Sequence, residues 1–306
     1  MAEWYTRATQ NRVPQGLRVR VPSPAQFKFM KKPKIIVVCG PTATGKTSYA
    51  IKLAKKIGGE IISADSRQVY KGINLLSGKV TKSEMGKIPH HLLDVAKPNK
   101  QFSVVDFQKL GKQKIEEIIS RGKIPIICGG TGLYIDALVY NTVLPDVKPN
   151  KKLRKKLENK TPEQLFKILL KLDPVRAKNI DAKNPARLVR AIEIAKELGK
   201  VPEIKKTSDY NIDWIYLDFP DIILKKRINT RLLERIKFGM IREAKKLHDN
   251  GVTYKKMESL GLECRTCAKY LQEKITKTEL IDELNNDIWH YVKRQRTWFK
   301  KFAKVK

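Results

Sequence analysis

The feature that most constrains this chain is a short apolar run that leads directly into a glycine-rich loop. Residues 34–39 read Lys-Ile-Ile-Val-Val-Cys, a β-branched run that is too short for a helix, and a helical pattern extends from residue 46 to residue 56. The loop between them consists of Gly40, Pro41, Thr42, Ala43, Thr44, Gly45, Lys46 and Thr47. Strand, loop and helix together predict a P-loop, which binds an anion through its backbone N–H groups and the helix N-terminus.

The residue types of this P-loop suit a phosphate ligand. Glycines let the backbone turn so that successive N–H groups face the anion. Lys46 contributes a positive charge, and Thr47 contributes a hydroxyl group that can bind Mg²⁺. We therefore assign all eight residues of the loop to diphosphate or nucleotide binding, and Thr47 also to the metal.

Two further strands end in polar or glycine-rich turns. Residues 60–64 lead to Asp65, and residues 124–128 lead to the turn Gly-Gly-Thr-Gly that contains Thr131. Helical patterns such as residues 105–120 lie between the strands. This alternation predicts an α/β fold with a doubly wound parallel sheet. Ligands bind beyond the carboxyl ends of such strands, so we expect the P-loop, Asp65 and Thr131 to share one crevice.

An acidic residue beside a P-loop has more than one ordinary role. Asp65 can bind Mg²⁺ in the manner of a Walker B aspartate, or it can act as a general base. It can also cap the turn or helix that begins with Ser66. The residue pattern alone leaves these three roles open.

Several motifs follow one another in a characteristic order. After the P-loop come Asp-Ser-Arg-Gln-Val-Tyr at residues 65–70, Pro-His-His-Leu-Leu-Asp at 89–94, and Gly-Gly-Thr-Gly-Leu-Tyr at 129–134. Asn-Pro-Ala-Arg-Leu-Val-Arg-Ala stands at 184–191, and Tyr-Val-Lys-Arg-Gln-Arg-Thr-Trp-Phe at 291–299. In this order the motifs resemble those of the tRNA dimethylallyltransferases, the IPP transferase family, over roughly residues 33–300.

The resemblance implies an activity and roles for particular residues. The family has a P-loop NTPase-like fold, and with Mg²⁺ it moves a dimethylallyl group from dimethylallyl diphosphate to N6 of the adenosine that is 3′-adjacent to the tRNA anticodon. By resemblance Asp65 accepts the N6 proton, Thr131 orients the amine or the donor, and Lys46 offsets charge on the departing diphosphate. The residues implied to bind the tRNA anticodon stem-loop are Asp65, Ser66, Arg67, Gln68, Thr131, Ala186, Arg187, Leu188, Val189 and Arg190.

Two further pairs of residues merit an assignment. Arg227 and Arg231 lie four residues apart on the helix expected after a strand at residues 214–219, so they share one face. We assign Arg227 to diphosphate binding, with solvated surface arginines as the alternative. His90 and His91 are expected in a loop, and they are expected to be structural or to contact tRNA because no third metal ligand accompanies them.

Charge supports a polyanionic partner. The chain has 64 Lys and Arg against 31 Asp and Glu, a net charge of +33. Residues 148–160 contain seven basic residues and one Glu, and residues 289–306 contain seven basic residues, five aromatic residues and no acid. Basic residues among aromatics suit single-stranded RNA, although helical aromatics more often belong to a core.

The sequence suggests three segments. Residues 1–30 form an extension outside the fold, residues 31–142 and 211–306 form the P-loop core with C-terminal helices, and residues 143–210 form a helical insertion that binds tRNA. Residues 1–29 contain four Arg and one Lys, whereas the remainder contains 13 Arg and 46 Lys. Val19-Arg20-Val21-Pro22 matches a translated T-arm of a tRNA gene, so we expect translation to start at Met30. The remainder has 59 basic and 30 acidic residues, a net charge of +29.

Cysteine usage and apolar runs indicate where the protein acts. Four cysteines make no disulfide framework, and Cys264 and Cys267 form a single C-x-x-C without a second pair, so neither a disulfide nor zinc is expected. The longest apolar runs are strand-sized, which excludes a membrane span. We expect a cytoplasmic monomer. One departure from the family is Leu262, which follows Gly261 where a tyrosine is usual, so no tRNA contact is assigned to that loop.

Three other functions share part of this pattern. A small-molecule P-loop kinase would turn over ATP, but it has no need of the large positive charge. An adenylate isopentenyltransferase shares the core and the prenyl donor, but it has no need of the helical insertion. A P-loop RNA-binding protein without catalysis would leave Asp65 replaceable.

Overall fold

A computed structural model describes residues 32–140, 142, 144–202, 207–300 and 302. The chain divides into two units at residue 32, and everything below concerns the unit Pro33–Lys306. The expectations for residues 1–30, including the start at Met30, lie outside the described residues. Within the described part of the chain, no helix is both long enough and apolar enough to cross a membrane.

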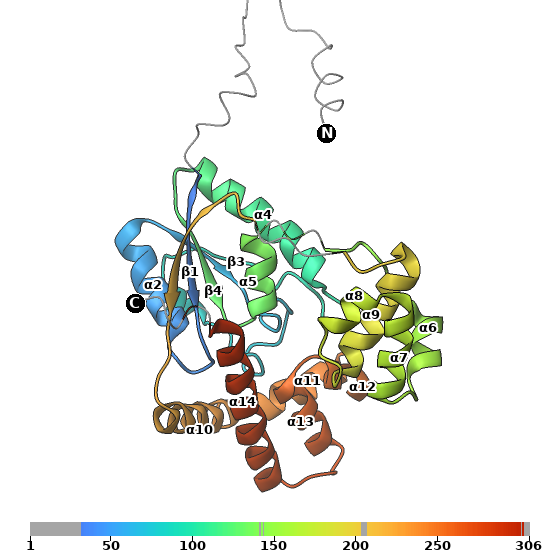
Figure 1. The fold of residues 1–306 in the computed structure, drawn as a ribbon. Helices are drawn as coiled ribbons and strands as arrows, with labels where there is room; N and C mark the ends of the chain where they lie inside the picture. The colour runs from blue at the N-terminus through green and yellow to red at the C-terminus, as the bar shows by residue number, and fades with distance from the viewer. Residues whose placement is uncertain (1–31, 141, 143, 203–206, 301, 303–306) are drawn as a thin grey trace, which may run out of the picture. The chain divides into compact units, whose positions relative to one another are not determined.

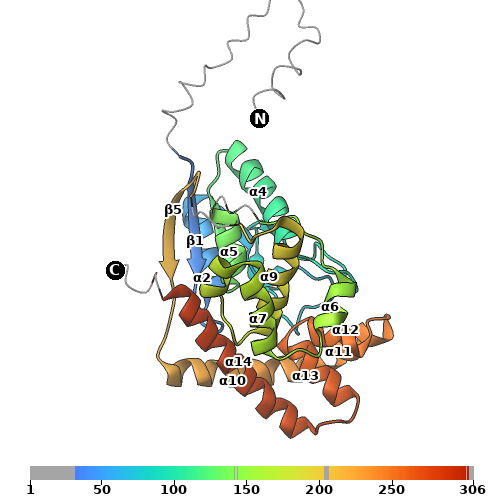
Figure 2. The ribbon, with the colours of Figure 1, turned by 45° about the vertical axis from the view of Figure 1, so that its right-hand side comes forward.

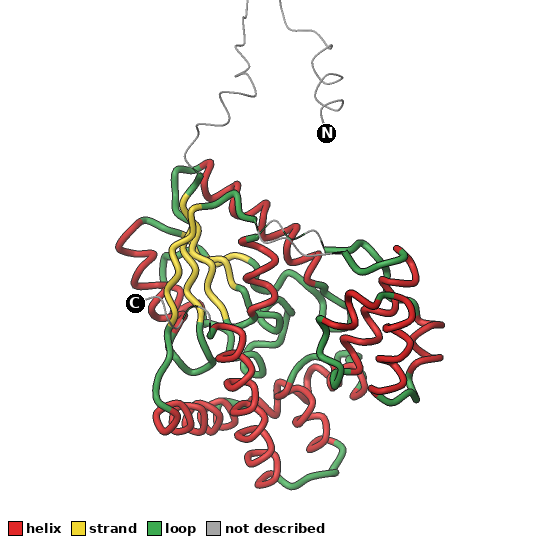
Figure 3. Tube along the Cα trace, in the orientation of Figure 1, coloured by secondary structure: helices red, strands yellow, loops and turns green. Residues whose placement is uncertain are grey.

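The centre of the fold is a parallel sheet. Its strands are β1 (Lys34–Cys39), β2 (Glu60–Ser63), β3 (His90–His91), β4 (Pro125–Gly129) and β5 (Asn211–Tyr216). They are arranged in the order β3-β2-β4-β1-β5, and every pair is parallel. Figure 3 shows the strands in yellow among the surrounding helices. The predicted parallel α/β sheet is therefore confirmed.

Strand residues alternate between two helical layers, which explains why the strands are apolar throughout. Ile35 and Val37 of β1 belong to the core shared with α4 (Val104–Ser120) and α5 (Gly132–Val139). Ile36 and Val38 belong to the opposite core, shared with α2 (Lys46–Ile57). Both faces of the sheet are buried in this way, as is usual in parallel sheets.

The edges of the sheet differ from the sequence prediction. His90 and His91 were expected in a loop, but they form the short edge strand β3, which pairs with Ile61 and Ile62 of β2. At the other edge, β5 begins at residue 211 rather than 214 and ends at 216 rather than 219. β5 pairs with β1 alone in this sheet, so its first residues are partly polar and exposed and do not produce an apolar run.

Helices from the C-terminal part of the chain cover the carboxyl ends of the strands. They are α10 (Asp221–Lys237), α11 (Met240–Asp249), α12 (Tyr254–Ser259), α13 (Leu262–Leu271) and α14 (Lys277–Phe299). Figure 1 shows α10 and α14 beyond the arrowheads of β1 and β4, and Figure 2 shows the same arrangement from another side. The short helix α3 (Lys82–Met85) lies between β2 and β3 in the chain.

Four helices form a group with a core of its own. They are α6 (Lys151–Leu157), α7 (Pro162–Leu172), α8 (Pro174–Lys178) and α9 (Pro185–Leu198), and they lie within the stretch expected to be a helical insertion (Figure 1). Buried leucines such as Leu165 and Leu169 of α7 pack against Leu188 and Ile192 of α9. The helix starts are typical, because α7, α8 and α9 each have proline in the first turn after a Thr, Asp or Asn cap.

Candidate active site

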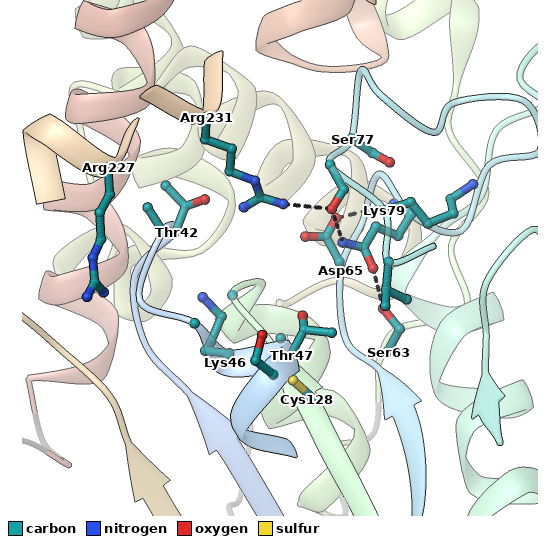
Figure 4. A pocket seen from close by; sticks show the side chains of 18 of the residues that line it. Thr42, Lys46, Thr47, Ser63, Asp65, Ser77, Lys79, Cys128, Arg227 and Arg231 are labelled. Atoms are coloured by element: carbon teal, nitrogen blue, oxygen red, sulfur yellow. Dashed lines mark hydrogen bonds between the residues drawn. The ribbon is translucent and has the colours of Figure 1, made fainter. Parts of the chain in front are cut away.

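A cavity of about 880 Å³ is formed by residues that follow the carboxyl ends of β1, β2 and β4, together with α10 and α14 (Figure 4). Of the residues assigned from the sequence, those that line it are Thr42, Ala43, Gly45, Lys46, Thr47, Asp65, Gln68 and Arg227. Gly40, Pro41, Thr44, Ser66, Arg67 and Thr131 belong to the same turns but are not among the lining residues. The structure thus brings the P-loop and Asp65 together in one cavity, as the strand ends predicted, whereas Thr131, which was expected in the same crevice, does not line it.

The P-loop closes around the carbonyl group of Pro41. Thr44 Oγ1 donates a hydrogen bond to Pro41 O at 2.9 Å, and Lys46 Nζ donates to the same oxygen at 2.5 Å. Gly40 has a φ of 142°, and a Cβ atom there would lie 2.0 Å from Leu217 O. The close approach of the residue after β5 therefore requires glycine at position 40.

Lys46 is held in an environment that disfavours its charge. Its side chain is half-buried, and desolvation of the ammonium group lowers its pKa to about 8. The negative charge of Asp65 partly opposes the effect. Figure 4 shows Lys46 and Thr47 next to each other at the start of α2. An anion bound here would favour the protonated form of Lys46.

Asp65 faces the cavity and also shapes the turn that carries it. Its Oδ1 atom accepts hydrogen bonds from the backbone N–H groups of Arg67 at 2.8 Å and Gln68 at 3.3 Å. The capping role that the sequence left open is therefore real. It uses one carboxylate oxygen and fixes the orientation of the group as a whole, so it is compatible with a catalytic role.

The turns after β2 and β4 lie against each other. Ser66 N donates to Thr131 Oγ1 at 3.1 Å, and Thr131 N donates to Ala64 O at 3.2 Å. A Cβ atom at Gly129 would lie 2.2 Å from Ala64 O, so this contact requires glycine. The threonine hydroxyl is thus placed beside the turn that Asp65 begins.

Helix α10 presents one face to the cavity, at positions three or four residues apart, as its period requires. The lining residues of this helix are Ile223, Lys226, Arg227, Thr230, Arg231 and Glu234. Arg231 Nη2 donates to Gly78 O at 2.9 Å, whereas the Arg227 guanidinium group lies 4.2 Å from the centroid of the Phe219 ring. In Figure 4 Arg231 points toward Ser77 and Asp65, and Arg227 points away from them. Both arginines thus belong to the cavity.

The wall opposite the P-loop is a loop, residues 73–79, that α10 and α11 hold in place. Arg235 donates to two of its carbonyl groups, those of Leu75 and Leu76, at 2.6 and 2.9 Å. The Glu243 carboxylate accepts three hydrogen bonds of 2.9–3.0 Å from consecutive N–H groups, those of Asn74, Leu75 and Leu76. The position of Gly78 O, and with it the orientation of Arg231, depends on this loop.

Helix α14 contributes two side chains to the cavity, Tyr291 and Gln295. Gln295 Oε1 accepts a hydrogen bond from Thr42 N, and Gln295 Nε2 donates to Gly130 O, each at 2.9 Å. The Tyr291 hydroxyl hydrogen-bonds the Thr131 side chain, and desolvation raises its pKa to about 12. The last long helix of the chain is therefore part of the site.

The second group of assigned RNA-binding residues, 186–190, lies on α9 and does not line the cavity. Ala186 and Arg187 are exposed in the first turn, and Val189 is half-buried. Leu188 is fully buried in the core of α6–α9, so its side chain is part of that core and not of a surface that RNA can reach. Arg190 donates to Glu193 at 3.3 Å, which gives it a structural partner.

Two of the five aromatic residues in the basic segment near the C-terminus belong to the core. Phe299 and Phe302 are buried, and the Phe302 ring stacks on Trp214 with centroids 3.8 Å apart. Trp289 has Lys225 Nζ 5.0 Å from its ring centroid. The alternative of core aromatics therefore holds for the two phenylalanines. Residues 301 and 303–306 lie outside the described residues.

The histidines have structural partners. His91 Nε2 contacts Glu60 Oε2 at 2.7 Å, and that buried carboxylate is also bound by Arg121 and Lys123. These interactions hold the pKa of Glu60 at about 2, although burial opposes the shift. His90 lines the cavity, and its Nδ1 lies 2.9 Å from Ile88 O.

The donor atoms of the cavity fit Mg²⁺ better than a softer metal. Among the described residues, no three His, Cys, Asp or Glu side chains gather as a metal centre. Cys264 and Cys267 are buried, and burial raises the pKa of both thiols, which disfavours the thiolate forms that bind zinc. Cys128 also lines the cavity, but burial raises the pKa of its thiol to about 12 and so disfavours the thiolate. The oxygen donors of the cavity include the Thr47 hydroxyl and the Asp65 carboxylate. Mg²⁺ commonly takes one or two such ligands together with substrate phosphates and water.

Lys79, Tyr291 and Gln295 are among the lining residues that escaped assignment from the sequence. Tyr291 and Gln295 lie four residues apart in the motif at 291–299, and this helical spacing puts them on one face. This spacing is the sequence signal from which their shared position on one helix face could have been predicted. Lys79 lies in a loop without any pattern, and its ammonium group contacts Asp94 at 2.6 Å.

Comparison with known proteins places these features in context. A family model described as IPP transferase matches residues 68–302. Among curated proteins, tRNA dimethylallyltransferase 2 of Treponema denticola is 45% identical over 275 residues, covering 88% of this chain and 92% of that protein. The tRNA dimethylallyltransferase 2 of Shewanella sediminis is 41% identical over 276 residues, covering 90% and 91%.

Solved structures show the same likeness. The full-length tRNA isopentenylpyrophosphate transferase of Bacillus halodurans matches with a TM-score of 0.66 and 38% identity, covering 88% of this chain and 87% of that one. A eukaryotic dimethylallyltransferase acting on tRNA matches with a TM-score of 0.71 and 28% identity, covering 87% and 70%. Both the sequence and the fold are therefore shared with these proteins over most of the chain.

Proposed function

The chain belongs to the IPP transferase family, and on this premise we propose that it is a tRNA dimethylallyltransferase. It moves the dimethylallyl group of dimethylallyl diphosphate to N6 of the adenosine that is 3′-adjacent to the anticodon. A bond forms between N6 and C1 of the prenyl group, and the C1–O bond breaks. Diphosphate leaves with that electron pair, and Asp65 takes the N6 proton.

The observation that carries the proposal is that Lys46 and Asp65 line the same cavity. A cation that neutralises a phosphate leaving group and a carboxylate that accepts a proton are the two groups that this alkyl transfer needs. The relatives named above are called tRNA dimethylallyltransferases, which favours tRNA as the acceptor over free adenylate. A small-molecule kinase can also use a carboxylate as a proton acceptor, but it has no need of a large positive charge.

The diphosphate half of the site is built from the P-loop and α10. Backbone N–H groups at the start of α2 and the Lys46 ammonium group bind the phosphates, which brings the helix dipole to bear on them. Arg231 is already oriented by Gly78 O, and Arg227 adds a second guanidinium group. These cations oppose the negative charge that grows on departing diphosphate.

Mg²⁺ is part of the proposal. Thr47 would hold the ion together with diphosphate oxygens, and the ion would supply further neutralisation of the leaving group. The fit rests on the oxygen donors of the cavity described above.

The acceptor half of the site consists of the turns after β2 and β4. An adenine inside an anticodon loop must leave its stack to reach a catalytic group, and an unpaired loop base does this at low cost. Asp65 then lies ready to accept the proton of an amine that is a poor nucleophile by itself. Thr131, which Ser66 N and Tyr291 hold, orients the amine.

We propose that the anticodon stem-loop contacts the helices α6 to α9 as well as the cavity. The α6 segment Lys-Lys-Leu-Arg-Lys-Lys-Leu exposes four lysines, and Arg187 is exposed at the start of α9. We also propose that the monomer is the active unit. The cytoplasm is the compartment in which such an enzyme would meet tRNA.

The proposal is tested by supplying dimethylallyl diphosphate with one of three acceptors, namely tRNA, an isolated anticodon stem-loop, or AMP. Nucleoside mass spectrometry should show the gain of one prenyl group on adenosine from tRNA and from the stem-loop. Asp65→Asn is the control. It keeps an oxygen that accepts from Arg67 N and Gln68 N, but it cannot take the proton, so turnover should fall at least about 10²-fold.

Two results would contradict the proposal. Prenylation of AMP without prenylation of any RNA would assign the enzyme to cytokinin synthesis. Unchanged turnover in a folded Asp65→Asn variant would remove Asp65 from its role as the base, even if tRNA is the acceptor.

A further inference from the structure

The side chain of Gln295 spans the two halves of the active-site cavity. It projects from α14, it is 5% exposed, and both ends of its carboxamide are bound. On one side Oε1 accepts from Thr42 N in the P-loop, and on the other side Nε2 donates to Gly130 O in the turn after β4. One planar group therefore links the loop that holds the donor to the turn that carries Thr131.

The two hydrogen bonds of Gln295 are of normal length, and its side chain packs tightly against Gly130. Both hydrogen bonds are 2.9 Å long, and a Cβ atom at Gly130 would lie 2.2 Å from Gln295 Nε2. The partners are a backbone N–H and a backbone C=O, so the link needs an acceptor and a donor on the same side chain. Glutamine supplies both, whereas an ionised glutamate lacks the donor and methionine lacks both strong hydrogen-bonding groups.

Neighbouring residues on the same face of α14 reinforce the contact. Tyr291, one turn earlier, hydrogen-bonds the Thr131 side chain. Trp298 follows three residues after Gln295, and a Cβ atom at Gly132 would lie 2.2 Å from its indole ring. The helix thus packs against the whole turn of residues 130–132, and Gln295 is the member of this face that also reaches the P-loop.

We propose that Gln295 is a positioning residue that sets the spacing between the diphosphate-binding loop and the acceptor-orienting turn. This inference rests on the proposed prenyl transfer. In a reaction between two bound substrates, a displacement of about 1 Å can cost about 10²-fold in rate while each substrate still binds its own half of the site. Loss of Gln295 therefore lowers kcat and leaves both KM values close to those of the wild type.

The test uses Gln295→Glu and Gln295→Met, which keep the length of the side chain. Gln108→Met is the matched control, because Gln108 also donates to two backbone carbonyl groups, at Ala137 and Thr142, but does not line the cavity. We expect kcat for prenylation of tRNA to fall roughly 10²-fold in both Gln295 variants and to stay near wild type in the control. Thermal unfolding of all variants checks that they remain folded.

A second readout does not depend on activity. Hydrogen–deuterium exchange of peptides that cover residues 40–47 and 129–134 reports on the two turns that Gln295 joins. We expect both peptides to exchange faster in Gln295→Met and neither to change in Gln108→Met.

The outcomes separate the inference from the proposed function. A folded Gln295→Met variant with wild-type kcat, or with unchanged exchange in both peptides, would overturn the positioning role. If the wild type prenylates none of the RNA substrates, the proposed function fails, and the exchange of the two peptides still decides whether Gln295 couples the turns.

Discussion

At the scale of single residues, Lys46 combines two properties that rarely coincide. Its ammonium group is the main cation of the P-loop, yet desolvation lowers its pKa to about 8. It donates to Pro41 O, a neutral carbonyl group. Without an anionic ligand, Lys46 therefore loses its proton at a lower pH than an ordinary lysine, and this loss can be measured.

The affinity for dimethylallyl diphosphate should depend on pH through Lys46. Because the pKa is lowered, the cation is present below about pH 8 and is lost as the pH rises through that value. Calorimetric titration without tRNA should therefore give a Kd roughly tenfold or more weaker at pH 9.5 than at pH 7, since hydrogen bonds to charged groups contribute about 1.5–3 kcal/mol.

Lys46→Arg is the control for this pH effect, because a guanidinium group stays protonated over the whole range. Its Kd should change little between the two pH values, whatever its absolute affinity. A wild-type Kd that is the same at pH 7 and pH 9.5 would show that Lys46 does not titrate in this range.

At the scale of elements, the loop of residues 73–79 has no regular structure of its own and depends on neighbouring helices. The Glu243 carboxylate on α11 accepts from three of its N–H groups, and Arg235 on α10 bonds two of its carbonyl groups. Gly78 O in the same loop orients Arg231. The helices therefore act on the diphosphate site through this loop.

Glu243→Ala should loosen that wall of the cavity. The variant leaves the partly buried N–H groups of Leu75 and Leu76 without their acceptor, which should lower the free energy of unfolding by about 1–3 kcal/mol. KM for dimethylallyl diphosphate should rise because Arg231 loses its fixed partner. Chemical denaturation and steady-state kinetics measure the two effects. Glu117→Ala is the comparison, since Glu117 forms a solvent-exposed pair with Lys114 and its loss should leave the free energy of unfolding nearly unchanged.

Equal effects of Glu243→Ala and Glu117→Ala on KM would show that the loop is positioned by other contacts. A lower stability with unchanged KM would confine Glu243 to a structural role.

The elements that could be predicted from the sequence are those with local patterns. Buried parallel strands such as β1 and β4 appear as apolar runs, and the P-loop and the turn of Asp65 follow from motifs at strand ends. The start of β5 and the two-residue strand β3 could not be predicted, because edge residues such as Asn211 and Asp213 are polar and exposed. The site predicted from the sequence lacked Gln295 for a similar reason. Thr42 and Gln295 are 253 residues apart, and a contact over that distance leaves no periodic trace in the sequence.

At the scale of the whole molecule, positive charge is the dominant property. The net charge of +33 belongs mostly to the residues from Met30 onward, which carry +29. On α6 the exposed lysines Lys151, Lys152, Lys155 and Lys156 have no share in the core, whereas Arg154 is bound to the buried Glu193 at 2.7 Å. The arginine fastens α6 to α9, and the lysines remain available to a polyanion.

Binding of tRNA should therefore weaken with salt, and α6 should contribute a definable share. Replacing Lys151, Lys155 and Lys156 by Gln should reduce the slope of log K against log salt concentration by about two to three, since each phosphate contact contributes about 0.7–0.9. Filter binding of tRNA between 50 and 200 mM salt measures the slope.

A matched triple variant separates a docking surface from general charge. Lys52, Lys55 and Lys56 are exposed on α2, and their replacement by Gln removes the same charge. Its slope should change much less. If the two triple variants behave alike, α6 is not a preferred contact surface.

The hydrogen bond between Thr42 N and Gln295 Oε1 also has a consequence for the folding of the chain during its synthesis. A ribosome adds about 5–20 residues per second, so roughly 13–50 s pass between synthesis of the P-loop and synthesis of its partner 253 residues later. During this interval the nascent chain has strands and a phosphate-binding loop but lacks the helix that joins the loop to the turn of Thr131. The hydrogen bond that joins the P-loop to α14 can therefore form only late in translation, after α14 has been synthesised.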